Sequence, residues 1–357
     1  MVKVEEPDRG DPVRRAEPRR LGGGGALAAM LLAGVESVAL DLKQPAAREV
    51  LERLLARADV LLESFRPGTL ARLGLDPAAL RAAHPRLVVC SLSGWGEEGP
   101  HARRAGHDLT YQAIAGALAS VPPGRPPAVP VADLAGAWSA VAAILAALLA
   151  RGRTGEGARI DAALLDGAAH ANLMTWAAAA DGGGAVGEPL PLAGALPAYN
   201  VYETKDGGRL ALGLLEPHLF ARFLAVAGRP ELAPLQFRDT DRARRRLAAL
   251  VAGRTRAEWE ALLAAEDLPV EPVLSAAEAR SHPQMAARGI VTQGPDDLPR
   301  LAFPARLDGA RPRAAPRVPA VGEDTEALLA ELGLKAGEGI GVRRPLRWKR
   351  LLAKLRR

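Results

Sequence analysis

Short apolar runs and amphipathic segments alternate along the first half of the chain. Residues 37–42 predict a strand, and residues 45–58 place apolar side chains at helical spacing, which predicts a helix. The same pattern predicts strands at 2–5, 59–63, 87–91 and 157–162, helices at 77–83, 110–119 and 165–178, and a long helix after Asp133. Strands that alternate with helices in this way favour an α/β domain with a doubly wound parallel sheet.

The second half is divided by two segments rich in proline or glycine, residues 181–197 and 298–319. Between them, residues 202–214 predict a β-hairpin with its turn at Asp206 and Gly207, followed by helices to residue 279. We therefore expect a large α/β domain and a smaller α+β domain. Residues 1–180 would form the first part of the large domain, 181–197 a linker, 198–297 the small domain, 298–335 a return linker with the last helix, and 336–357 a basic tail.

The composition is that of a folded globular protein, with 48% hydrophobic and 25% charged residues among 357. The single cysteine, Cys90, lies in an apolar run, which predicts a buried thiol, no intramolecular disulfide and a cytoplasmic location. Residues 1–20 are charged and lack the apolar region of a secretion signal, so we expect no secretion. The uncharged run 134–150 is more typical of a buried helix than of a membrane span, so we expect no membrane partner.

The formal net charge of +6 is concentrated in the predicted tail. Eight lysines and arginines and no acid fall within residues 341–357, so the rest of the chain carries −2. Because the basic residues belong to the tail, the sequence does not predict nucleic-acid binding. The sequence also lacks P-loop, dinucleotide, paired-cysteine and HExxH patterns, so we expect no metal and no redox cofactor.

Three residues with acid/base chemistry, His107, Asp133 and Glu216, each lie among small or apolar neighbours. A histidine and carboxylates can move a proton on and off carbon without a metal or a redox cofactor, which predicts an enzyme. Each residue also has a structural alternative. His107 could be a partly buried, hydrogen-bonded histidine, Asp133 could cap the long helix, and Glu216 could open a helix at Pro217.

Several short blocks in one order resemble a known family. They are residues 40–45, 61–68, 72–75, 85–96, 105–111, 132–133, 154–157 and 206–217, and they include Glu63-Ser64-Phe65-Arg66-Pro67-Gly68 and Ala105-Gly106-His107-Asp108. From residue 1 to about residue 333 the sequence resembles the family III CoA-transferase superfamily of the CaiB/BaiF type. Within that superfamily it is most similar to the α-methylacyl-CoA racemases.

The two branches of this superfamily imply different roles for Asp133. In the transferases it is implied to be a nucleophile that forms an acyl anhydride. In the racemases, Asp133 and His107 are implied to be acid/base groups on opposite faces of the substrate, with Glu216 supporting the histidine. The transferases generally lack the histidine. The resemblance therefore implies a cofactor-independent racemase or epimerase of 2-methylacyl-CoA thioesters, with an acyl-CoA:carboxylate CoA-transferase as the alternative.

The resemblance also implies that CoA is part of the substrate. Its expected contacts are Leu40, Asp41, Leu42, Lys43, Ser64, Phe65, Arg66, Arg72, Gly106, Asp108, Leu109, Thr110 and Tyr111. Backbone N–H groups at the start of the helix after Asp133 are expected to bind the enolate oxygen. The helix N-terminus would lower the pKa of Asp133 while apolar neighbours would raise it, and the sequence leaves the direction open.

The family resemblance implies an interlocked-ring homodimer in which Glu216 reaches His107 of the partner subunit. The segment Val2–Glu5 matches what is normally the second strand of the family, so we expect the first βα unit to be missing. Loss of that unit would leave a strand edge unpaired. A degenerate acyl-CoA-binding protein is therefore a third hypothesis.

Overall fold

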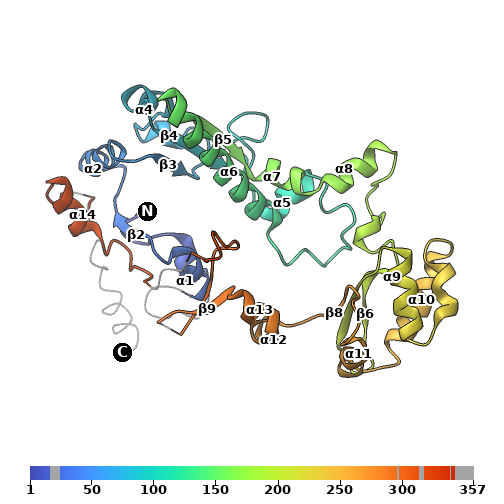
Figure 1. The fold of residues 1–357 in the computed structure, drawn as a ribbon. Coiled ribbons are helices and arrows are strands. Elements are labelled where there is room, and N and C mark those ends of the chain that lie inside the picture. The colour runs from blue at the N-terminus through green and yellow to red at the C-terminus, as the bar shows by residue number, and fades with distance from the viewer. Residues whose placement is uncertain (17–24, 296, 313–316, 338, 342–357) are drawn as a thin grey trace, which may run out of the picture. The chain divides into compact units, whose positions relative to one another are not determined.

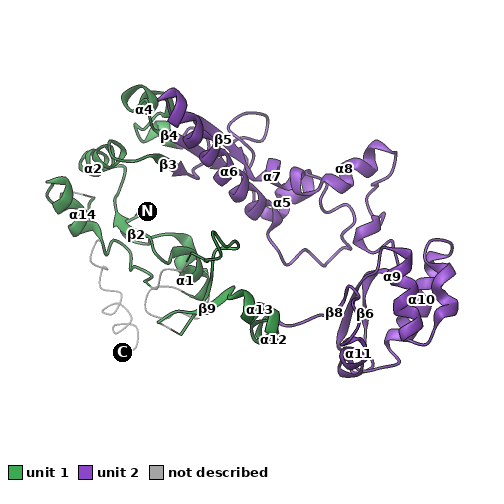
Figure 2. Cartoon of the chain, in the orientation of Figure 1, with its two compact units in different colours: residues 1–61, 70–87, 276–357 green, residues 62–69, 88–275 purple. Residues whose placement is uncertain are grey.

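The computed structural model describes residues 1–16, 25–295, 297–312, 317–337 and 339–341 (Figure 1). The chain divides into two compact units (Figure 2). Unit 1 comprises residues 1–61, 70–87 and 276–357, and unit 2 comprises residues 62–69 and 88–275. Most of the predicted basic tail, residues 342–357, lies outside the described residues.

Unit 1 is built around a pair of parallel strands. Its strands are β1 (Val2–Glu5), β2 (Glu36–Ala39), β9 (Val291–Gln293) and β10 (Pro299–Leu301), and its helices are η1 (Pro12–Arg15), α1 (Ala26–Leu32), α2 (Pro45–Leu55), α4 (Pro77–Ala83), α12 (Ala276–Ser281), α13 (Pro283–Arg288) and α14 (Thr325–Leu332). β1 runs parallel to β2, with Val2 opposite Glu36 and Glu5 opposite Ala39. The strand predicted at residues 2–5 and the helix predicted at residues 77–83 are confirmed.

A buried ion pair lies at the end of β1. Arg14 Nη2 is 2.7 Å from Glu5 Oε2, and both side chains are almost fully buried. Ser37 Oγ on β2 donates a hydrogen bond to the same Glu5 oxygen, and Arg14 Nη1 donates one to the Pro319 carbonyl. Burial alone would raise the pKa of Glu5, but the hydrogen bonds from Arg14 and Ser37 outweigh it and hold that pKa below its ordinary value.

Unit 2 contains a second parallel sheet and an antiparallel one. Its strands are β4 (Val88–Ser93), β5 (Arg159–Ala163), β6 (Tyr199–Glu203), β7 (Arg209–Gly213) and β8 (Val270–Pro272). Its helices are α5 (Asp108–Ile114), α6 (Val131–Thr154), α7 (Leu164–Ala171), α8 (Leu173–Ala180), η2 (Pro191–Ala193), α9 (Pro217–Val226), η3 (Pro230–Leu235), α10 (Thr240–Val251) and α11 (Arg256–Leu263). The short elements β3 (Val60–Glu63) and α3 (Thr69–Arg72) cross the boundaries between the units.

The parallel sheet of unit 2 has the strand order β3-β4-β5. β4 and β5 are parallel, with Val89 opposite Arg159 and Ser93 opposite Ala163. Cys90 on β4 is fully buried, as predicted, and burial raises the pKa of its thiol to about 11. The described strands and helices thus form an α/β fold with parallel sheets, which confirms the predicted class.

Two glycines allow α6 to pack closely against α7. A Cβ atom on Gly167 would lie 2.4 Å from the backbone nitrogen of Gly136, and one on Gly136 would lie 2.6 Å from a methyl carbon of Leu164. Such distances are too short for any larger residue, so the backbones of the two helices are in direct contact. This contact comes one turn after Asp133 and fixes the first turns of α6 against α7.

The single helix predicted over residues 165–178 is wrong. The structure has two helices, α7 and α8, separated at Asn172. Asn172 Nδ2 donates a hydrogen bond to the Ala115 carbonyl, and its Oδ1 accepts one from Thr175 Oγ1. An asparagine side chain that bonds to nearby groups in this way competes with helical hydrogen bonding, which explains the break.

The long helix α6 differs from the expectation of a buried helix. Only Ala132, Gly136 and Ala140 of this helix are buried, and of the described helices it alone has the length and composition to cross a membrane. One face exposes large apolar side chains at helical spacing: Leu134, Trp138, Val141, Leu145 and Leu149. The sequence could not show this, because an apolar helix has the same composition whether its own chain or another surface covers it.

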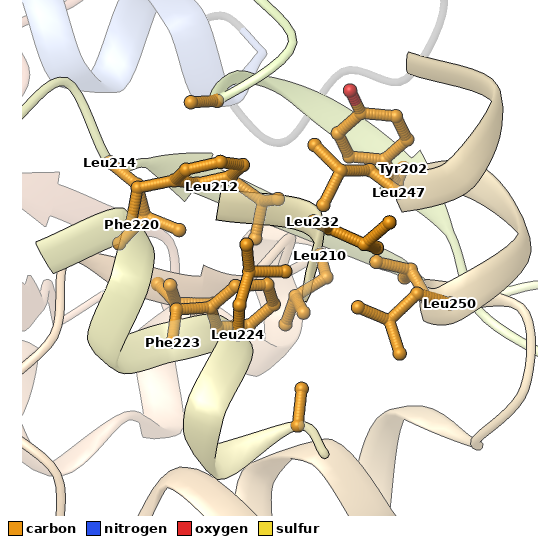
Figure 3. Close-up of a cluster of buried hydrophobic side chains, with 14 of the residues drawn as sticks. Tyr202, Leu210, Leu212, Leu214, Phe220, Phe223, Leu224, Leu232, Leu247 and Leu250 are labelled. Atoms are coloured by element: carbon orange, nitrogen blue, oxygen red, sulfur yellow. The ribbon is translucent and has the colours of Figure 1, made fainter. Parts of the chain in front are cut away.

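The antiparallel sheet β6-β7-β8 packs with α9, α10 and α11 around a separate core within unit 2 (Figure 3). Phe220, Phe223 and Trp259 are almost completely buried there, and the rings of Phe223 and Trp259 stack. The predicted hairpin is confirmed, with β6 paired antiparallel to β7. Asp206 in its turn accepts hydrogen bonds from Thr204 Oγ1 and the Arg256 N–H.

Candidate functional site

Asp133 lies in the first turn of α6, as the third helical residue. The helix begins at Val131 and its N-cap is Pro130, whose position has no side-chain capping bond. The alternative that Asp133 caps this helix is therefore wrong, because the helix already includes it. The Asp133 side chain is exposed, and within the described part of the chain it makes no hydrogen bond or ion pair.

The capping bonds of α6 come from Asp108, at the start of α5. Asp108 Oδ1 accepts from the N–H of Ala132 at 2.8 Å and from the N–H of Asp133 at 3.1 Å. The N–H of Leu134 donates to the Pro130 carbonyl at 3.0 Å. The expectation that the helix start binds an enolate oxygen is therefore contradicted for these three N–H groups, because each already has an acceptor.

His107 is the N-cap residue of α5 and is exposed. Its backbone is fixed by Thr110: the His107 N–H donates to Thr110 Oγ1 at 3.0 Å, and that hydroxyl donates to the His107 carbonyl at 2.7 Å. The imidazole is exposed at the surface of unit 2. The alternative of a partly buried histidine is therefore wrong.

Burial and the charges around Asp133 decide the direction in which the pKa of its carboxyl group is shifted, which the sequence left open. Desolvation raises the pKa of the Asp133 carboxyl, the negative charge of Asp108 raises it further, and His107 lowers it by a smaller amount. The net effect is a raised pKa. A carboxyl group with a raised pKa is protonated over a wider pH range, and this suits it to donate a proton.

The hydroxyl group of Tyr111 lies within reach of the charges of both Asp133 and Arg66. Burial raises the pKa of the Tyr111 hydroxyl, the charge of Asp133 adds to this, and Arg66 opposes it. The Tyr111 ring fills a slot over Gly94 and Gly106, where added Cβ atoms would lie 2.1 Å and 2.5 Å from its atoms. Trp95 packs edge-on against the same ring, with 4.7 Å between ring centroids. The two glycines are therefore needed for Tyr111 to lie beside Asp133.

The residues expected to bind CoA fall into two groups. Ser64, Phe65, Arg66, Gly106, Asp108, Leu109, Thr110 and Tyr111 belong to unit 2, whereas Leu40, Asp41, Leu42, Lys43 and Arg72 belong to unit 1. The side chains of Arg66, Arg72 and Lys43 are exposed. Leu40 is 2% exposed, and its N–H donates to the Glu5 carbonyl, so its side chain contributes to the core of unit 1.

Glu216 is the N-cap residue of α9, immediately before Pro217. The structural alternative for Glu216, that it opens a helix at Pro217, is confirmed. Its side chain is exposed, and among the described residues it makes no hydrogen bond to His107. Support of His107 by Glu216 therefore stays a prediction.

The role of Asp108 as a cap was missed from the sequence. The acceptor and its donors are separated by 24 and 25 residues, so no local pattern connects them. One signal was present: Gln112 lies four residues after Asp108 on the same helix face, and its Nε2 donates to Asp108 Oδ2 at 2.6 Å. Among the described residues, no cluster of histidine, cysteine, aspartate or glutamate could hold a metal ion.

Parallel strands that lead into helices, with an exposed histidine and a carboxyl group at the starts of α5 and α6, form an α/β fold that holds two groups able to transfer protons. The family model described as CoA-transferase family III matches residues 1–325. Human alpha-methylacyl-CoA racemase is 36% identical over 323 residues, which cover 85% of this chain and 82% of the racemase.

Two further relatives widen the comparison. The acetyl-CoA:oxalate CoA-transferase of Acetobacter aceti is 31% identical over 349 residues, which cover 92% of this chain and 88% of the transferase. The crystal structure of a CAIB/BAIF family protein from Brucella suis is 30% identical and has a TM-score of 0.79 over 93% of this chain and 91% of that one. The chain therefore belongs to CoA-transferase family III, as its sequence blocks predicted.

Proposed function

We propose that this protein is a racemase or epimerase of 2-methylacyl-CoA thioesters that works without a metal or redox cofactor. The observation that carries the proposal is the exposed imidazole of His107 within electrostatic reach of Asp133. The similarity to human alpha-methylacyl-CoA racemase supports the same reaction class. Proton transfer at a carbon next to a thioester needs two such groups, one on each face.

In the proposed reaction the imidazole of His107 removes the α-proton from one face of the substrate. The electron pair of the broken C–H bond moves onto the thioester oxygen and gives a planar enolate. The carboxyl group of Asp133 then delivers its proton to the opposite face, which leaves an imidazolium and a carboxylate. The opposite stereoisomer uses the two residues in exchanged roles, and the raised pKa of Asp133 supports its role as donor.

Transfer of CoA between carboxylic acids is the second candidate. It is favoured by the similarity to the acetyl-CoA:oxalate CoA-transferase and by the exposed position of Asp133. There the Asp133 carboxylate would attack the thioester carbonyl and release CoA as a thiolate, leaving an acyl anhydride. This route needs Asp133 ionised and gives His107 no role. Binding of acyl-CoA without reaction is the third candidate.

One experiment separates the three candidates. The protein is incubated with a single 2-methylacyl-CoA stereoisomer in D₂O, with and without an acceptor carboxylate. We expect deuterium at the α-carbon without acceptor, and we expect His107→Ala to remove it. Movement of CoA only when acceptor is present would support the transferase, and binding without either reaction would support the third candidate. Unchanged exchange in His107→Ala would exclude His107 from the mechanism.

For CoA itself, we propose that the cations Lys43, Arg66 and Arg72 contact the phosphates and that the other residues predicted from the family blocks line the binding region. Arg66 is the best placed of the three for a test, because its charge acts on the hydroxyl of Tyr111, which also interacts with Asp133. Arg66→Met should raise the KM for acyl-CoA more than it lowers kcat. A matched change at Arg57, which is exposed and lies two residues after the end of α2, should leave both values unchanged.

We also propose a homodimer, with Glu216 of the partner subunit supporting His107. The exposed apolar face of α6 supports a protein interface, because contiguous apolar surface of this kind marks association sites. Leu145→Lys should give a monomer by light scattering, whereas Val186→Lys, at an even more exposed apolar residue outside α6, should not. A monomeric wild-type protein at assay concentration would contradict this part of the proposal.

A further inference from the structure

One side chain links the two elements that carry His107 and Asp133. Asp108 follows His107 directly in the chain, and its carboxylate accepts from the backbone N–H of Asp133 itself at 3.1 Å. A second bond from the N–H of Ala132 to the same oxygen, at 2.8 Å, attaches the first turn of α6 at two points. Asp108 therefore connects the two acid/base residues directly.

The Asp108 carboxylate is itself held in place. Gln112, which is 2% exposed, donates from Nε2 to the second oxygen, Oδ2, at 2.6 Å. Each carboxylate oxygen thus has a defined donor, one set on α6 and the other on α5. None of these donors is a cation, so the hydrogen bonds themselves do not neutralise the negative charge of Asp108 beside Asp133.

We propose that Asp108 is a positioning residue that fixes the separation of His107 and Asp133. The inference rests on the proposed function, because only a reaction that uses both residues depends on their separation. Its charge has a second effect: the groups that act on Asp133 are Asp108, His107 and Tyr111, and of these Asp108 adds to the raised pKa of Asp133. Through its hydrogen bonds and its charge, Asp108 thus affects both the position and the protonation of Asp133, the proposed proton donor.

This role predicts a difference between two reactions. Proton exchange needs His107 and Asp133 on opposite faces of one carbon, where a misplacement of about 1 Å can cost about 10²-fold in rate. Acyl transfer would need Asp133 alone. Loss of the hydrogen bonds that Asp108 accepts should therefore reduce α-proton exchange much more than any CoA transfer that the protein performs.

The test uses two substitutions at Asp108 and one control. Asp108→Ala removes the acceptor, and we expect kcat for α-deuterium exchange to fall about 10²-fold, a larger effect than any on KM. Asp108→Asn keeps an oxygen that can accept from Ala132 and Asp133, and should rescue kcat to within about 10-fold of wild type. Asp166→Asn, which removes an exposed carboxylate from the first turn of α7, should change neither value.

A second measurement does not depend on activity. In the protein without substrate, ¹³C-detected titration of aspartate carboxyls should show Asp133 titrating at lower pH in Asp108→Asn than in wild type, because a like charge has been removed. The same titration of Asp133 in both proteins, or full exchange activity in a folded Asp108→Ala protein, would overturn the proposal. A wild-type protein without any exchange would refute the proposed function instead, while the titration would still decide whether Asp108 acts on Asp133.

Discussion

Two carboxyl groups, one in each unit, show how differently this protein treats its acids. Glu5 in unit 1 is fully buried and bonded to Arg14 and Ser37. Asp133 in unit 2 is exposed and has a second carboxylate, Asp108, as its charged neighbour. The pKa of Glu5 is lowered and that of Asp133 is raised. Both shifts follow from the groups that each side chain meets.

The difference indicates which acid serves structure and which serves chemistry. A buried carboxylate whose oxygens accept several hydrogen bonds cannot change its protonation without losing them, so Glu5 is suited to holding β1, β2 and the loop of Arg14 together. A carboxyl group without a bonded partner, next to a like charge, can gain and lose a proton with no structural cost. Asp133 is of this second kind.

The largest expected effect is on activity. Asp133→Asn should lower α-proton exchange by at least about 10²–10⁴-fold, because its amide cannot donate or accept the transferred proton. Glu5→Gln should leave the exchange rate of the folded protein close to wild type. Deuterium incorporation measured at a temperature where both variants are folded checks this. Comparable losses in both variants would mean that the two acids do not differ in role.

The next effect is on stability. Arg14→Met would leave the Glu5 carboxylate buried without its cation, and removing one partner of a buried pair costs about 3–5 kcal/mol. The double variant Glu5→Gln with Arg14→Met should recover much of this loss, because no buried charge is left unpaired. Urea unfolding at neutral pH measures both. A double variant less stable than Arg14→Met alone would contradict the explanation.

The comparison also shows how much the sequence could predict. Apolar periodicity predicted the strands at residues 2–5 and 87–91 and the helix at residues 77–83, because those patterns are local. His107 and Asp133 were singled out for their acid/base chemistry, and the family blocks then implied their roles. Neither the Asp108 cap nor the contact of Arg14 with Pro319 could be predicted, since the bonded groups are 25 and 305 residues apart.

Other differences have local causes that the sequence carries in weaker form. Asn172 is the signal in the sequence for the break between α7 and α8. An asparagine inside a helical pattern does not always end the helix, as this one does by donating a hydrogen bond to the Ala115 carbonyl. The exposed face of α6 could not be distinguished from a core face, because periodicity shows which residues share a side and not what covers it. Long-range partners and exposure thus account for most of what was missed.

A smaller effect tests whether the first turn of α6 must stay in place. Gly167→Ala would push a Cβ atom against the Gly136 backbone, and such overpacking costs about 1–3 kcal/mol. Because the contact follows one turn after Asp133, exchange activity should fall as well. Gly152→Ala, near the end of α6, has open space around it and should be neutral or stabilising. Thermal unfolding and exchange rates of the two variants check this, and equal behaviour would mean that the helix contact does not position Asp133.

The last effect is in the pH dependence of stability, where substitutions of the two acids should differ in sign. The lowered pKa of Glu5 means that its ionised form stabilises the fold above its ordinary pKa, and that this contribution is lost as the pH falls through the lowered folded value. Glu5→Gln should therefore be less stable than wild type near about pH 7, by an amount that shrinks towards about pH 3. The raised pKa of Asp133 means that its ionised form is disfavoured in the fold, so Asp133→Asn should be at least as stable as wild type at neutral pH, with any gain disappearing in acid. Urea midpoints across this range measure both differences, and two variants that shift stability in the same direction at neutral pH would show that Glu5 and Asp133 are not opposites.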